Sequence, residues 1–235
     1  MPGIMDRVID HRAASERFVT RTEGRTTWHS FSFGAHYDPA NVGFARLVAH
    51  NDERLPAGTG YPDHPHEDLE IVTWVLSGAL RHTSNVGNGV VGPGQVQRLS
   101  AGRGVVHAEM ADAPGETRFL QSWVRPDEPG TEPDYVAADV SMGPEQAGWT
   151  CVASGDGDGV VPLGARGAAL HVAHLGAGQQ LALPEAPGLH VFVADGSVRL
   201  GERVLHVDDA ARLTDEGGRE VGAEMPAQLV VWALG

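Results

Sequence analysis

Residues 58–78 read GTGYPDHPHEDLEIVTWVLSG, and residues 92–109 read GPGQVQRLSAGRGVVHAE. In the first stretch the apolar run Glu70–Leu76 lies between a segment rich in glycine, proline and histidine and a closing glycine. Its β-branched and aromatic side chains favour a strand, and the flanking glycines and prolines favour turns. Similar short runs recur at Phe44–Ala49, Val105–Ala108, Phe119–Val124, Leu170–Leu175, Leu189–Ala194 and Leu229–Leu234. Many short strands between turn residues predict an all-β sandwich or barrel.

Two pairs of polar residues stand at the borders of these expected strands. His64 and His66 precede the first run, and His107 and Glu109 follow the Gly102–Gly104 turn. Side chains two residues apart on an extended chain point to the same face, so each pair can project to one side. If the two stretches pair inside a barrel, the four side chains converge on one point.

Three imidazoles and one carboxylate are a donor set that suits a divalent transition metal. An octahedral ion held by these four donors keeps two positions open, as a catalytic site requires, whereas a closed tetrahedral zinc would be structural. Both kinds of site stay open at this point. The other histidines of this half, His36, His50 and His82, are interpreted as hydrogen-bonding residues rather than ligands.

The spacing of these residues resembles two conserved motifs of the cupin proteins. The first is matched by Gly58, His64, His66, Glu70 and Gly78, and the second by Gly92–Gly94, Gly104 and His107. The wider stretches HSFSFG (29–34), HPHEDLE (64–70), SAGRGVVHAE (100–109) and LQSWV (120–124) resemble the pirin family, over about residues 25–126. The resemblance implies a bicupin, with two cupin barrels of the double-stranded β-helix (jelly-roll) type in one chain.

In that family the metal ligands fall on His64, His66, His107 and Glu109 of this sequence. The resemblance implies one divalent metal in the N-terminal barrel, with Fe(II) expected first and Ni, Co, Mn or Zn as alternatives. Some members are quercetin 2,3-dioxygenases, and others are metal-dependent regulators that bind a partner protein. A short bacterial pirin-like protein is therefore expected.

The domain division follows from the same comparison. We predict a metal-binding cupin domain over residues 1–126, a connection over 127–148 and a degenerate cupin domain over 149–235. When Gly196 is laid on Gly78, the positions of His64 and His66 fall on Ala182 and Pro184, which cannot bind a metal. A short helix is predicted only near residues 10–19. Turns that supply positive φ angles or fix φ near about −65° are predicted at Gly87-Asn88-Gly89, Gly92-Pro93-Gly94 and Gly102-Arg103-Gly104.

Composition excludes several other functions. The chain of 235 residues has no lysine, and its 17 arginines against 31 acidic residues give a net charge of −14. A Schiff-base or phosphate-loop lysine is therefore excluded, and the negative charge disfavours nucleic acid and anionic membranes. The single cysteine, Cys151, permits no intrachain disulfide, and no apolar stretch resembles a signal peptide or a membrane span. We predict a cytoplasmic protein.

The function expected from the resemblance is cleavage of a flavonol such as quercetin by O2, with release of carbon monoxide. Glu109, the single carboxylate of the donor set, is the candidate base for the 3-hydroxyl proton. The alternative is a regulator without enzymatic activity, whose metal or redox state is sensed by a protein partner. A metal-dependent isomerase is a third hypothesis, because fold does not determine chemistry.

Overall fold

The computed structural model describes residues 8–140 and 148–235. Within them the regular secondary structure consists of strands and a single 3-10 turn, which confirms the all-β prediction. The helix predicted near residues 10–19 is wrong. That segment contains strand β1 (Val8–Arg12), a single 3-10 turn (Ala14–Glu16) and the start of β2 at Phe18. β1 pairs with β19 (Ala210–Thr214), and this long-range ladder overrides a local helical tendency.

Contacts divide the described residues into two compact units. The first unit contains residues 18–140 and 153–166, and the second contains residues 8–17, 148–152 and 167–235. Each unit therefore draws on more than one stretch of the chain. The predicted boundaries at residues 126 and 149 stay a prediction, and residues 141–147 of the predicted connection lie outside the described residues.

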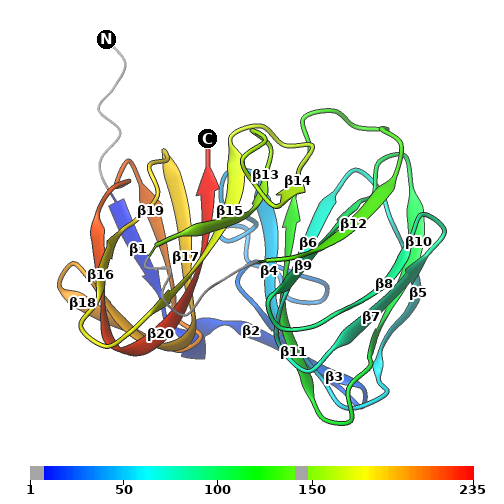
Figure 1. The fold of residues 1–235 in the computed structure, drawn as a ribbon, viewed down its shortest axis with the longest axis horizontal. Helices are drawn as coiled ribbons and strands as arrows, with labels where there is room; N and C mark the ends of the chain where they lie inside the picture. The colour runs from blue at the N-terminus through cyan, green and yellow to red at the C-terminus, as the bar shows by residue number, and fades with distance from the viewer. Residues whose placement is uncertain (1–7, 141–147) are drawn as a thin grey trace. The chain divides into compact units, whose positions relative to one another are not determined.

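Two antiparallel sheets form the first unit and face each other as two layers (Figure 1). The larger sheet has the order β12-β9-β6-β11-β4-β3-β2, and the smaller has the order β5-β10-β7-β8. The larger contains β2 (Phe18–Thr22), β3 (Arg25–His29), β4 (Leu47–Leu55), β6 (Glu70–Ser77), β9 (Gln95–Ser100), β11 (Thr117–Val124) and β12 (Asp134–Asp139). The smaller contains β5 (Gly60–His66), β7 (Leu80–Ser84), β8 (Asn88–Val91) and β10 (Val105–Ala111).

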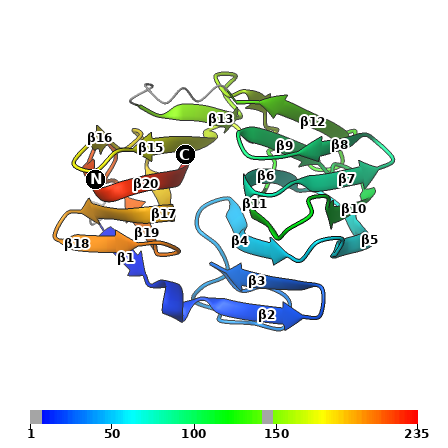
Figure 2. The ribbon, with the colours of Figure 1, turned by 60° about the horizontal axis from the view of Figure 1, so that its bottom comes forward.

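The second unit is built around two long paired strands, β17 (Gly188–Leu200) and β20 (Glu220–Leu234) (Figure 2). β19 and then β1 continue the sheet beyond β17, and β15 (Ala168–Leu175) continues it beyond β20. β16 (Gln180–Ala182) pairs with the start of β20, at residues 220–222. β18 (Arg203–His206) pairs with the end of β17, at residues 197–200. β13 (Thr150–Ser154) begins in this unit and ends in the first, where β14 (Val161–Pro162) pairs with it in parallel through Ala153 and Val161.

Gly78 and Gly196 have the same role in the two units. Their φ angles are 77° and 75°, in the region that favours glycine. A Cβ atom would lie 2.7 Å from the Thr117 Cα atom at Gly78, and 2.8 Å from the Ala227 Cα atom at Gly196. Each glycine therefore combines a left-handed backbone conformation with a close backbone approach, Gly78 directly after β6 and Gly196 at a register shift within β17.

The interior of the first unit is layered. One apolar cluster contains Ile71, Leu99, Ala101 and Val105, and another contains Leu55, Val75, Leu80, Val91, Ala111 and Phe119. Because alternate residues of a strand share a face, the positions between these clusters also point inward. They are buried polar residues, namely Glu53, Thr73, His82, Gln97, His107, Glu109 and Gln121. A polar layer thus lies between two apolar ones.

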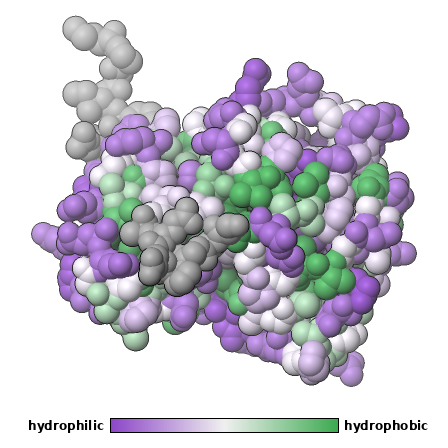
Figure 3. Space-filling model, viewed as in Figure 1, coloured by the Kyte–Doolittle hydropathy of each residue, from purple (hydrophilic) through white to green (hydrophobic). Residues whose placement is uncertain are grey.

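Hydrophilic side chains cover most of the molecular face drawn in Figure 3, and apolar ones gather there in small, separate groups. This surface agrees with the strongly negative composition. Among the described residues, no helix has the length and apolar character needed to cross a membrane.

Candidate metal centre

The paired strands β5 and β10 position the predicted ligands. Their antiparallel ladder places His107 opposite His64 and Glu109 opposite Tyr61. The register shifts between these two pairs, so one residue of β10 faces two residues of β5, Pro62 and Asp63. Such a bulge twists a strand and redirects the side chains beside it.

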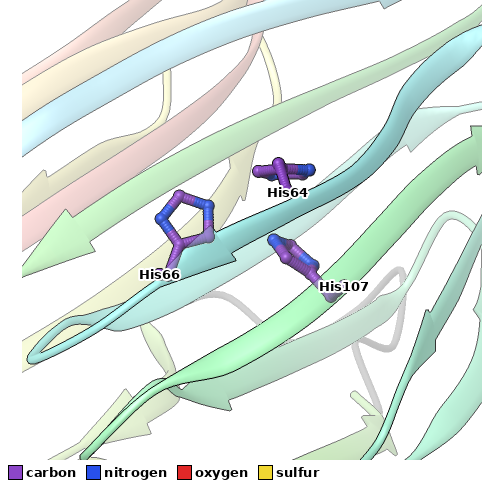
Figure 4. A group of neighbouring side chains, drawn as sticks. All are labelled: His64, His66 and His107. Carbon is purple, nitrogen blue, oxygen red and sulfur yellow. The ribbon is translucent and has the colours of Figure 1, made fainter.

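Three histidine rings meet where these strands pair (Figure 4). The ring centroids of His64 and His107 lie 4.3 Å apart, those of His64 and His66 4.9 Å, and those of His66 and His107 5.1 Å. One nitrogen from each ring lies within 4.8 Å of the other two. His107 is buried, whereas His64 and His66 are partly exposed, so the group lies between the interior and solvent.

The hydrogen bonds of these rings fit a metal site. The Nδ1 atom of His64 lies 2.8 Å from the Pro62 carbonyl oxygen, and as a donor to it leaves Nε2 with a free lone pair. The Nε2 atoms of His66 and His107 are buried and have no hydrogen-bond partner. Because buried polar atoms are normally paired, two unpaired nitrogens beside a third imidazole suit a bound cation.

Glu109 lies deeper in the unit and belongs to a second group. Its carboxylate lies within 4.8 Å of nitrogens of His82 and His107, a group that does not include His64 and His66. Glu109 Oε1 accepts a hydrogen bond from Gln97 Nε2 at 2.8 Å, and Oε2 accepts one from Gln121 Nε2 at 2.7 Å. The structure thus brings three of the four predicted ligands into one group, and His107 connects that group to Glu109.

Burial controls the charges of the centre. It lowers the pKa of His66 to about 4, with a further contribution from His64. Burial lowers the pKa of His107 still more, and the three neighbouring histidines add to the effect. The imidazoles of His66 and His107 are therefore neutral at pH 7, which is the form that binds metals. Burial also raises the pKa of Glu109 to about 7, although the bonds from Gln121 and Gln97 oppose the shift.

His82 is a neighbour of the centre that the sequence interpretation placed among ordinary hydrogen-bonding residues. Its Nδ1 atom lies 3.4 Å from Nδ1 of His107, and its buried Nε2 atom has no hydrogen-bond partner. Its inward orientation follows the alternation of β7, where Leu80 and His82 are buried and Arg81 and Thr83 are exposed. That alternation is the signal that could have identified it.

A second buried carboxylate, Glu53 on β4, belongs to the same polar layer. Glu53 Oε2 accepts hydrogen bonds from Thr27 Oγ1 at 2.6 Å and from the Tyr61 hydroxyl at 2.8 Å. Burial raises the pKa of Glu53 to about 7, and the charge of Glu109 contributes to the rise. By contrast, Glu70, part of the first cupin-like motif, accepts hydrogen bonds from the Ser100 hydroxyl and belongs to neither histidine group.

A pocket of about 500 Å³ adjoins the centre. Its lining consists of Pro65, His66, Glu67, Asn85, Gly104, Val105 and Val106. The volume lies within the range of small-molecule sites, and the lining combines apolar contact with a carboxylate and an amide at the surface. His66 is the residue that the pocket and the histidine group share.

Two β-sheet units with histidines gathered on paired strands of one unit define a bicupin. Residues 11–124 match the family model described as Pirin. A Mycobacterium tuberculosis protein named "Putative quercetin 2,3-dioxygenase Rv0181c" is 42% identical over 235 residues, covering 98% of this chain and 96% of its own. The chain therefore belongs to the pirin family, which confirms the resemblance.

Two Escherichia coli proteins add to this comparison. One, named quercetin 2,3-dioxygenase, is 40% identical over 126 residues, which cover 53% of this chain and 54% of its own. The other is the bacterial pirin YhhW, solved in complex with nickel(II). Its structure matches 97% of this chain and 99% of its own, with a TM-score of 0.89 and 28% identity.

Proposed function

We propose that this protein is a metal-dependent dioxygenase that cleaves a flavonol. The observation that carries the proposal is the group His64, His66 and His107. The rings of His66 and His107 have unpaired nitrogens, and the buried carboxylate of Glu109 lies beside His107. The names of the mycobacterial and Escherichia coli relatives support this activity. The pocket beside His66 offers room for a small aromatic substrate.

His64, His66 and His107 would hold one divalent ion, and Glu109 would complete the set. Fe(II) is the ion expected from the family resemblance, and nickel is supported by the complex of the Escherichia coli pirin. When bound, the ion supplies Lewis acidity and a template that orients substrate and O2. In the net reaction one flavonol and one O2 give a ring-opened ester and one carbon monoxide. The ring carbon that carried the 3-hydroxyl leaves as carbon monoxide together with the oxygen of that hydroxyl. Both atoms of O2 stay in the ester.

The protein residues would handle the proton and the surroundings of the reaction. A carboxylate oxygen of Glu109 would take the proton of the flavonol 3-hydroxyl. Of the residues in the two donor groups, those other than Glu109 are all histidines. The amides of Gln97 and Gln121 hold both of its oxygens and so determine where that proton acceptor points. The apolar clusters on both sides of the polar layer exclude water from it.

The test is aerobic turnover of quercetin by protein reconstituted separately with Fe(II), Ni(II), Co(II), Mn(II) and Zn(II). Loss of the flavonol absorbance and release of carbon monoxide are followed together. We expect turnover with at least one metal and none in His64→Ala. His174→Ala is the matched control, because His174 is exposed on β15 of the second unit.

Glu109→Gln tests the base separately. It should keep the fold and lose turnover, and full turnover with bound metal would contradict the role assigned to Glu109. Absence of turnover with every metal, in protein whose metal content is stoichiometric, would overturn the enzymatic proposal. The regulatory alternative would then be tested by capture of a protein partner with and without metal.

A further inference from the structure

Tyr135 occupies a fitted slot beside the metal centre, although it lies in the segment predicted to be a connection. Its strand, β12, pairs with β9 along its whole length. The Tyr135 ring stacks on His82, with centroids 4.3 Å apart and planes 8° apart. On β12 it is flanked by the more exposed Asp134 and the partly buried Val136.

Gly87 and Gly89 provide the room for this ring. A Cβ atom on Gly87 would lie 2.6 Å from Tyr135 Cδ1, and one on Gly89 would lie 2.5 Å from the Tyr135 hydroxyl oxygen. Neither glycine has a positive φ angle, unlike Gly94, Gly102 and Gly104 of the other two predicted turns. The two residues are small because the aromatic ring needs their space.

The Tyr135 hydroxyl determines the orientation of one glutamine. It donates a hydrogen bond to Gln97 Oε1 at 3.0 Å, and Gln97 Nε2 donates to Glu109 Oε1 at 2.8 Å. With the oxygen end of its amide engaged by Tyr135, Gln97 must turn its NH2 group toward Glu109. Removal of the hydroxyl would leave that amide free to reverse and present an oxygen to the carboxylate.

The ring of Tyr135 also affects His107, the histidine donor of β10, through His82. Stacking fixes the plane of His82, whose Nδ1 atom lies 3.4 Å from Nδ1 of His107. A histidine ligand usually engages its second ring nitrogen with a neighbouring group, which fixes its tautomer and orientation. A bond at Nδ1 leaves Nε2 of His107 for the group with His64 and His66.

We propose that Tyr135 is a positioning residue that orients both donors of β10, Glu109 through Gln97 and His107 through His82. This inference rests on the metal site of the proposed function. Tyr135 touches neither donor in this arrangement, so its effect on metal binding passes through the two intermediates. The segment that carries it therefore belongs to the metal centre rather than to a linker.

The experiment compares the metal dissociation constants of the whole protein and of Tyr135→Phe, measured with Co(II) alone. The visible absorption of bound Co(II) reports the coordination geometry. Phenylalanine keeps the stacking on His82 and removes only the hydroxyl. We expect binding about 10-fold weaker, with a changed absorption band. Tyr37→Phe is the matched control, because the Tyr37 side chain is 75% exposed, and it should bind Co(II) as the wild type does.

Two further variants keep the test decisive if Tyr135→Phe folds poorly. Gly89→Ala leaves Tyr135 unchanged but displaces its hydroxyl, and it should weaken Co(II) binding in the same direction. Gln97→Met removes the amide that connects Tyr135 to Glu109, the relay between them. Adding Tyr135→Phe to this variant should therefore change the Co(II) band much less than it does in the wild type. Independent, additive effects of the two substitutions would overturn the relay.

The outcomes separate this inference from the proposed function. Wild-type protein that binds no Co(II) would contradict the metal site itself. Wild-type protein that binds one equivalent, with an unchanged constant and spectrum in Tyr135→Phe and Gly89→Ala, would overturn the positioning role alone. Two equivalents per chain, one of them lost in His82→Asn, would also overturn it, because His82 would then be a ligand.

Discussion

The interiors of the two units differ although both are built from antiparallel β-sheet. In the first unit a layer of buried polar side chains, which includes His107 and Glu109, lies between two apolar clusters. In the second unit the inward positions of the main strands form one continuous cluster of valine, leucine and alanine. The shared scaffold thus holds the candidate metal centre in one unit and a closely packed apolar interior in the other.

Strand β5, which carries His64 and His66, and the corresponding strand β16 of the second unit show the same contrast. On β5, His64 and His66 turn toward His107. Around β16 of the second unit, Leu183 belongs to the apolar cluster and Leu181 packs against it, whereas Ala182 is exposed. The inward positions are therefore leucines, one residue away from the Ala182 and Pro184 positions expected from the alignment of the glycines. A leucine pair in place of a histidine pair leaves no donor for a metal.

The largest effect is expected from substitution of His107, the residue that both donor groups share. His107→Ala should weaken Co(II) binding at least about 100-fold, because His107 lies in the group with His64 and His66 and in the group with Glu109. The measurement is titration of the metal-free protein with Co(II). His174→Ala in the second unit should leave the dissociation constant unchanged, and equal losses in the two variants would break the contrast between the units.

The second prediction tests the packed interior. Leu229 on β20 is fully buried in the apolar cluster. Leu229→Ala should lower the free energy of unfolding by about 2–5 kcal/mol, because it removes buried apolar atoms and leaves a cavity. Urea denaturation measures the loss. The Co(II) dissociation constant should change less than about twofold, and a larger change would show that the metal centre depends on packing in the second unit.

Local patterns in the sequence predicted much of the first unit. The spacing of His64 and His66, and of His107 and Glu109, placed each pair on one face of a strand, because side-chain direction alternates along a strand. The β-branched runs predicted strands for the same local reason, as at Glu70–Leu76, where the structure has strand Glu70–Ser77.

Features that depend on contacts far apart in the chain were not predictable in this way. Tyr135 reaches Gln97 across 38 residues, and no periodicity near Tyr135 indicates that contact. The two amides that bond Glu109 come from β9 and β11, which lie elsewhere in the chain than β10. Strand β1 replaces the predicted helix because its partner β19 lies about 200 residues further along the chain.

The third prediction concerns the electrostatic cost of the polar layer. Glu53 has its pKa raised from 4.5 to about 7, mainly by burial. The folded protein therefore retains a proton that the unfolded chain releases, so this group favours folding most below pH 4.5 and progressively less as the pH rises to 7. Above pH 7 the buried charge costs on the order of 3 kcal/mol.

Glu53→Gln removes that charge and keeps an oxygen that can accept from Thr27 and Tyr61. The free energy of unfolding should rise on the order of 2 kcal/mol at pH 8 and by much less at pH 4.5. Urea denaturation at both pH values is the measurement, with the exposed Glu132→Gln as a control. An equal gain at both pH values would show that the charge of Glu53 is not its source.

The smallest effects are expected where the two units are alike, on their surfaces. Each carries an exposed ion pair with a 2.6 Å contact, Arg81 with Asp112 in the first unit and Arg199 with Glu224 in the second. Water screens the attraction between the charges of an exposed pair, and ordering two long side chains costs entropy that offsets most of the rest. Arg81→Ala and Arg199→Ala should therefore each lower the free energy of unfolding by less than about 1 kcal/mol. The measurement is urea denaturation at low and at high salt, where screening should reduce both losses. A loss several times larger in one variant than in the other would show that the units differ on their surfaces as well as in their interiors.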